Sequence, residues 1–214
     1  MEDVKVEKLI ALFPSIDTLV PMLRSFEGVL DCQVTATCKM DSTMSLIMPS
    51  INSSCYLHGD NMVLLDGETF TEISKTLMFK NKKRNMIDSI SVDLAIKDNK
   101  IEVFPFLVEM DRYKVAVGGT HNLDMTFNYH LSVLKSPVPF KLGIDITGNL
   151  DDFKYKITKC IYKDIFKPAK QAELDSTRKN IRKDIRDAVR KQIEEAAPEL
   201  EKDLALVKAA DVWE

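Results

Sequence analysis

The stretch VGGTHNLDMTFNYHLSVLKSPVPFKLGIDITGNLDDFKYKI, residues Val117–Ile157, decides the fold class, because apolar and polar residues alternate along nearly all of it. A period of two is typical of antiparallel strands that bury one face. It predicts three strands, Met125–Val133, Phe140–Ile146 and Phe153–Ile161, with turns at residues 136–139 and 148–149. The Gly118-Gly119 pair predicts another turn, since glycine adopts positive φ without strain.

The same alternation occurs upstream. One strand is predicted over Leu30–Met40 and continues over Met44–Met48. Two short strands are predicted within residues 54–67, with a turn at residues 59–61. Residues 87–111 form a predicted hairpin that turns at Asp98-Asn99.

Helical spacing replaces this alternation in three places. Leu9 and Ile10 predict a short helix near the start, and a second short helix with Phe26 on its apolar face would follow Pro14. Thr69 with Glu72 forms a capping box that predicts an interior helix. Residues 175–197 predict a helix in the tail, and Pro198 is expected to break it.

The predicted fold is therefore α+β. It consists of a curved, mostly antiparallel meander sheet of about nine strands with an apolar inner face, since strands that are neighbours in sequence pair through short turns. Short helices lie at the N-terminus and inside the chain, and the C-terminal tail is helical. We expect a β-groove domain over residues 1–165 and a helical tail over residues 166–214.

The composition limits the classes of function. The chain has 214 residues, of which 45% are hydrophobic, so it can form a sizeable core. Its net charge of −3 argues against nucleic-acid binding. It contains no run of 18 apolar residues and no signal peptide at the start, which leaves a cytoplasmic protein or a piece of a longer exported one.

Catalytic and metal-binding motifs are absent from the sequence. His58, His121 and His130 do not stand at metal-ligand spacing, except for an isolated Cys55-x-x-His58, and a metal site needs three or four ligands. His130 alternates onto the polar side of its strand, which is typical of a solvated position. A hydrolase has no supporting G-x-S-x-G motif. Cys32 and Cys38 lie too far apart to bond to each other. Either could pair across strands with Cys55 or Cys160, and the alternative is that the cysteines are small buried residues.

The apolar side of the predicted sheet is the unusual feature, because methionine and phenylalanine recur along it. A packed core explains such a face, and so does a groove open to acyl chains, for which flexible Met and large Phe are suitable linings. The candidates for groove contact are Met40, Met44, Met125, Phe127, Phe140, Leu142, Ile144 and Phe153. A basic run could contact lipid headgroups or be a solvated helix end; it comprises Lys80, Lys82, Lys83 and Arg84.

Several segments resemble the carboxy-terminal region of AsmA-family proteins, closest to the Bacteroidetes branch. They include FKNK (residues 79–82), PFLVEMDRY (105–113) and VGGTHNLDMTFNYHLSVLKSPVPFK (117–141). IDSISV (87–92), GIDITGNLDD (143–152) and the tail segment DSTRKNIR (175–182) also fit. The resemblance covers roughly residues 1–165 and carries structural rather than catalytic signatures.

This resemblance implies a periplasmic segment of a longer protein that is anchored in the inner membrane and acts in outer-membrane biogenesis. AsmA-like proteins are similar to TamB-like and other repeating β-groove proteins. The implied function is non-enzymatic binding or transfer of phospholipid along the groove. The alternative is a capping or docking module that binds an outer-membrane protein. No cofactor, metal or nucleic acid is expected as a partner.

Overall fold

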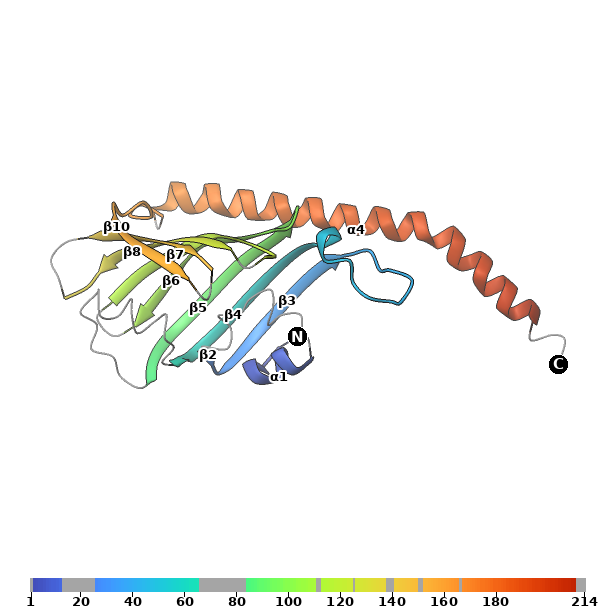
Figure 1. The fold of residues 1–214 in the computed structure, drawn as a ribbon, viewed down its shortest axis with the longest axis horizontal. Coiled ribbons are helices and arrows are strands. Elements are labelled where there is room, and N and C mark those ends of the chain that lie inside the picture. The colour runs from blue at the N-terminus through green and yellow to red at the C-terminus, as the bar shows by residue number, and fades with distance from the viewer. Residues whose placement is uncertain are drawn as a thin grey trace.

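A computed structural model describes residues 2–12, 26–65, 84–110, 113–124, 126–137, 141–149, 152–165 and 167–210. The strands of this part form one curved sheet, and a long helix extends across it (Figure 1). The strands are β1 Val4–Lys5, β2 Phe26–Glu27, β3 Val29–Thr37, β4 Asn52–Leu65, β5 Arg84–Lys97, β6 Lys100–Met110, β7 Tyr113–Asn122, β8 Phe127–Lys135, β9 Leu142–Gly148 and β10 Phe153–Thr158. The helices are α1 Val6–Leu12, the 3-10 turn η2 Met48–Ser50 and α4 Pro168–Ala210.

The sheet is an open antiparallel meander. Its order is β1-β3-β4-β5-β6-β7-β8-β9-β10, and β2 pairs with β4 beside β3. Each strand from β3 onward pairs with the next one in sequence, so the predicted antiparallel meander is confirmed. The predicted hairpin is confirmed as β5–β6, where Asp98 and Asn99 both have positive φ in the turn.

Two predicted turns are wrong, because their residues lie inside strands. β4 continues through Gly59 and Asp60, and Asn61, at φ 52°, produces an irregularity rather than a reversal. β7 continues through Gly118 and Gly119. A Cβ on Gly119 would lie 2.4 Å from the Asn128 carbonyl oxygen, so this glycine permits close approach of β8 and does not form a turn.

Three further predictions fail at the ends of elements. β3 ends at Thr37, so Met44–Met48 does not continue that strand. Phe26 lies in β2 and not in a helix. α4 runs through Pro198, because one proline removes a single helical hydrogen bond and a long helix can continue past it with a bend. The predicted interior helix that begins at Thr69 lies outside the described residues.

Register assigns the side chains to two faces, since directly paired residues point to the same side of a sheet. One face, which we call the α4 face, carries Tyr56 opposite Asp93 and His130 opposite Asp145. The other, which we call the α1 face, carries the paired row Val34, Cys55, Leu94, Val103, Gly119, Tyr129, Ile146 and Tyr155. The neighbouring rows of the α1 face are largely apolar, but one of them includes the buried polar residues Ser53 and His121.

Candidate functional site

The predicted groove residues fall into three groups. Phe127, Leu142, Ile144 and Phe153 lie on the α1 face by register. Ile144 is buried at 1% exposure, and the other three are half-buried. Met40 and Met44 lie in the β3–β4 loop, not in a strand, and are 54% and 77% exposed. Met125, Phe140, Lys80, Lys82 and Lys83 lie outside the described residues, as does the side chain of Arg84.

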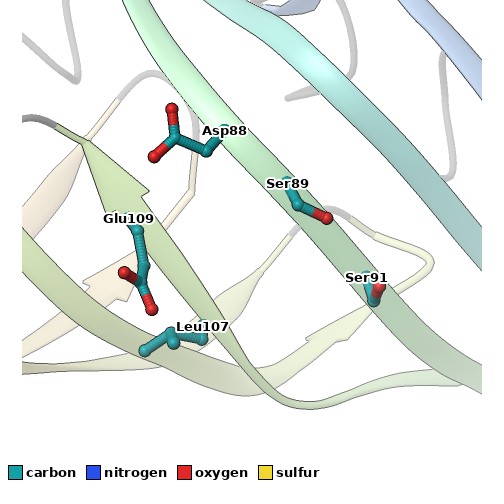
Figure 2. Close-up of a pocket in the computed structure, with 5 residues that line it drawn as sticks. All are labelled: Asp88, Ser89, Ser91, Leu107 and Glu109. Atoms are coloured by element: carbon teal, nitrogen blue, oxygen red, sulfur yellow. The ribbon is translucent and has the colours of Figure 1, made fainter.

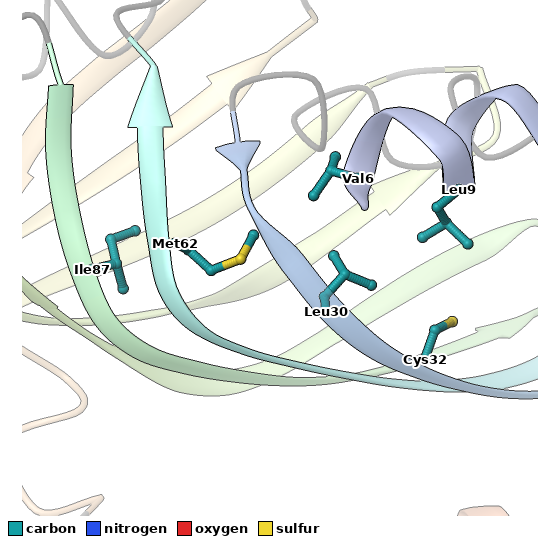
Figure 3. Packing of buried hydrophobic residues seen from close by; sticks show 6 residues of the cluster. All are labelled: Val6, Leu9, Leu30, Cys32, Met62 and Ile87. Carbon is teal, nitrogen blue, oxygen red and sulfur yellow. The ribbon is translucent and has the colours of Figure 1, made fainter. Parts of the chain in front are cut away.

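One end of the α1 face is covered by helix α1. Figure 3 shows Val6 and Leu9 of this helix directed toward Leu30 and Cys32 of β3, with Met62 and Ile87 beside them. Val6 and Leu9 are each only 1% exposed. This cluster is a sealed core, and its residues are not accessible to a ligand in this structure.

A cysteine pair lies in this covered region. Cys32 and Cys55 stand diagonally on neighbouring strands, since Cys32 pairs with Leu57 and Cys55 pairs with Val34. Neither forms a disulfide. The hydrogen bond from Cys55 lowers the pKa of Cys32 to about 7, and the same bond, together with burial, raises the pKa of Cys55.

The loop before β4 covers another part of the sheet. Ile51 forms a cluster with Leu94, Ile96 and Ile101, and Met48 packs against this cluster. Ile101 is fully buried. The α1 face is thus closed at the two places where these clusters lie.

Other positions on the α1 face remain open. Val34 on β3 is 52% exposed, and Ile157 on β10 is 62% exposed. Tyr155, also on β10, is exposed as well. The face therefore combines a buried middle with exposed apolar residues toward both edges of the sheet.

A polar network lies on the α4 face. His130 Nδ1 is 2.5 Å from Asp145 Oδ1, and His130 Nε2 is 3.0 Å from Ser132 Oγ. His130 and Asp145 are directly opposed on β8 and β9. His130 is 7% exposed and Ser132 is fully buried, so the expectation that this side of β8 is solvated was wrong. The chain after β10 covers both residues.

This network has the hydrogen-bond order of a Ser-His-Asp triad. Two observations favour a structural role instead. Ser132 is absent from the lining of the neighbouring cavity of about 650 Å³, although His130 and Asp145 contribute to it. The nearby N–H groups donate to the network itself: Tyr162 N–H to Ser132 Oγ at 3.0 Å, and Ile161 N–H to His130 Nε2 at 3.5 Å. They stabilise the covering segment and do not form an oxyanion hole.

The second cavity lies where the sheet divides (Figure 2). β5 pairs with β6 over Leu94–Lys97 and Lys100–Val103. The register of β6 against β7 shifts between Val103 and Phe106, around Pro105. Beyond this point lies a cavity of about 290 Å³ lined by Asp88, Ser89, Ser91, Leu107 and Glu109. Glu109 pairs with Lys114 at 2.5 Å. These residues show no arrangement specific to a ligand.

Among the described residues, no three metal-ligating side chains gather into a group, and no helix is long and apolar enough to cross a membrane. Comparison of the chain with protein-family models, characterised proteins and solved structures gives no match. The function must therefore be argued from the geometry of the sheet.

Proposed function

We propose that the α1 face is the inner wall of a groove that binds lipid acyl chains and that the protein acts without catalysis. The observation that supports this function is the unbroken row of paired residues from Val34 on β3 to Tyr155 on β10, which is apolar except for Gly119. Such a surface favours hydrocarbon, because apolar area gains free energy when it leaves water.

The exposed ends of the face are the proposed contact points. Val34 and Ile157 remain open although their neighbours in the middle of the sheet are buried. The exposed apolar surface is thus divided between the two edges of the sheet, at β3 and β10, and each part offers apolar area that gains free energy when hydrocarbon covers it. Together with the resemblance to AsmA-family proteins, this supports phospholipid as the ligand and the periplasm, within a longer anchored protein, as the location.

Aspartate substitution at these exposed positions tests the proposal. Val34→Asp and Ile157→Asp place a charge beside hydrocarbon, which is unfavourable, whereas the charge stays solvated in the free protein. The variants should fold normally and carry less phospholipid, measured by mass spectrometry of the purified protein. Thr35→Asp and Lys156→Asp are matched controls, since both are exposed, adjacent and on the opposite face.

An equal lipid content in all four variants and the unchanged protein would contradict the groove. The second candidate function is a capping or docking module for an outer-membrane protein. It is favoured by helix α1, whose Val6 and Leu9 close one end of the face. In that case, purified protein should carry no phospholipid at all.

A further inference from the structure

The β3–β4 loop carries a second apolar surface, separate from the sheet. Four large apolar side chains within residues 40–47 are exposed: Met40 at 54%, Met44 at 77%, Leu46 at 42% and Ile47 at 39%. We call these four residues the loop tip. The loop extends away from the ends of β3 and β4 (Figure 1). Exposed large apolar residues concentrated in this way indicate an interaction surface.

The loop tip is ordered by its own hydrogen bonds. Asp41 Oδ1 accepts the N–H of Thr43 at 2.8 Å, the hydroxyl of Thr43 at 2.6 Å and the N–H of Ser45 at 3.0 Å. Met40 and Leu46 form a β-bridge, and Asp41 N–H donates to the Ser45 carbonyl at 2.9 Å. These bonds fix the backbone, so binding requires little further loss of conformational entropy.

The base of the loop is anchored in the core. Ser50 Oγ accepts the Lys39 N–H at 2.7 Å and donates to the Ile47 carbonyl at 2.7 Å. Ile51 is buried at 8% exposure in its cluster with Leu94, and Met48 packs against the same cluster. Some apolar residues of the segment thus secure it to the sheet, while those of the loop tip remain free.

We propose that the loop tip inserts shallowly into the surface of a phospholipid bilayer. A stable protein interface buries about 800 Å² on each partner with about 20–30 residues, far more than four side chains on one hairpin offer. A bilayer needs only a small convex apolar surface whose backbone is already hydrogen-bonded, because hydrocarbon supplies no partner for free N–H groups. The N–H groups of Asp41, Thr43, Met44, Ser45 and Ile47 all have acceptors within the loop.

The charges of the loop set the depth of insertion. Lys39 and Asp41 are the two charged residues of residues 38–50, and both are exposed. Hydrogen bonds from the Thr43 side chain and from the Ser45 and Thr43 amides lower the pKa of Asp41, so its carboxylate stays ionised. The ionised carboxylate remains at the level of the headgroups while Met44 and Leu46 reach the boundary of the acyl chains. Because the two charges cancel, bilayer binding should depend weakly on salt.

Vesicle flotation of the full chain tests this proposal, with vesicles of phosphatidylethanolamine and phosphatidylglycerol as the probe. The double variant Met44→Ser/Leu46→Ser should lower the bound fraction about fivefold or more, since it removes two apolar side chains from the contact. Val29→Ser/Met86→Ser is the matched control, because it removes two exposed apolar side chains that lie outside both the loop tip and the row proposed to bind acyl chains. This control should float as the unchanged protein does.

A second measurement separates insertion from a change in folding. Met44→Trp in a Trp213→Phe background should show a blue shift of tryptophan emission when vesicles are added. Failure of the unchanged protein to float, or no loss of flotation in the double variant, overturns the proposal. If the double variant still floats but no longer forms a dimer that the unchanged protein forms, the proposal is overturned as well. The loop tip is then assigned to self-association. The loop variants should keep the phospholipid that co-purifies with the protein. A failure of the bilayer-insertion proposal can therefore be distinguished from a failure of the proposed groove.

Discussion

Arg182 of α4 forms an ion pair with Asp93 of β5, which is 89 positions earlier in the chain. Arg178, one helical turn before Arg182, lies 3.4 Å from the other oxygen of Asp93 and donates to the Pro105 carbonyl at 3.0 Å. The Arg182 guanidinium also lies 5.4 Å from the centre of the Tyr56 ring. These contacts hold the helix against the α4 face at the place where the sheet divides.

Asp93→Asn should therefore loosen α4. Asp93 is buried at 7% exposure, so its loss leaves two guanidinium groups without their carboxylate. We expect destabilisation of about 1.5–3 kcal/mol, the typical contribution of hydrogen bonds to charged groups. Urea denaturation measures the free energy of unfolding, and hydrogen exchange should show faster opening of residues 168–190. Asp88→Asn, an exposed change on the same strand, is the control and should change neither.

Gly119→Ala should destabilise the sheet between β7 and β8. The added Cβ would meet the Asn128 carbonyl oxygen at 2.4 Å and Tyr129 Cα at 2.7 Å, both of which belong to backbone. Overpacking of this kind costs about 1–3 kcal/mol. Thermal unfolding measures the effect, and Thr120→Ala at the next position provides the control. An unchanged melting temperature for Gly119→Ala would contradict the close approach of these strands.

Ser132→Ala should release the segment that follows β10. The change removes the acceptor of the Tyr162 N–H and one partner of His130, at a cost of about 1–3 kcal/mol for the groups left unsatisfied. Limited proteolysis should then cut within residues 159–167 faster than in the unchanged protein. Thr147→Ala, an exposed change on the α4 face, is the control.

A fluorophosphonate probe separates this structural role from catalysis. The probe labels activated serines, and it should leave Ser132 unmodified because this residue is fully buried. Stoichiometric labelling of Ser132 would instead assign the His130 network to a hydrolase.

The period-two pattern predicted which side chains share a face more reliably than it predicted where strands end. Val34, Leu94, Tyr129 and Ile144 all lie on the α1 face, as their alternation indicates, because successive side chains of a regular strand point to opposite faces of the sheet. Gly118 and Gly119 were interpreted as a turn since glycine is common there. Their actual role, close contact with β8 and Tyr162, depends on residues distant in sequence.

The polar network was missed for a similar reason. His130 and Ser132 at positions i and i+2 do share a face, and this signal was visible in the sequence. Burial of that face depends on the Tyr162 segment, which returns after β10 and donates its N–H to Ser132. Alternation alone does not reveal a covering segment that comes later in the chain.

Two Asp-x-Thr turns should make part of the stability sensitive to acid. Asp124 accepts the N–H and hydroxyl of Thr126 at 2.9 and 2.6 Å, much as Asp41 does with Thr43. The Thr hydroxyl bond in each turn, together with amide bonds, lowers the pKa of the carboxyl group. A carboxyl group whose pKa is lower in the folded state than in the unfolded state stabilises the fold at pH values above its unfolded-state pKa of about 4. This contribution is lost as the pH falls through the folded-state pKa.

Asp41→Asn and Asp124→Asn should therefore be less stable than the unchanged protein at neutral pH. The difference should shrink below about pH 4, where the carboxyl groups of the unchanged protein become protonated as well. Urea midpoints measured across this range test the sign of the effect. Asp98→Asn is the control, because asparagine suits the positive φ of the hairpin turn. A difference that stays constant with pH would contradict the role of the ionised carboxylates.

Leu9→Ala should uncover Cys32, since Leu9 belongs to the cluster in which α1 covers this thiol. In the unchanged protein, maleimide should react first with exposed Cys38, while Cys32, at 2% exposure, is protected. Once α1 is loosened, the rate at Cys32 should rise with a midpoint near its pKa of about 7, because the Cys55 hydrogen bond favours the thiolate. Mass spectrometry of peptides measures both rates, and Lys8→Ala, an exposed change on the same helix, should leave them unaltered. Fast labelling of Cys32 in the unchanged protein would show that α1 does not seal this end of the face, which would remove the main observation in favour of a docking module.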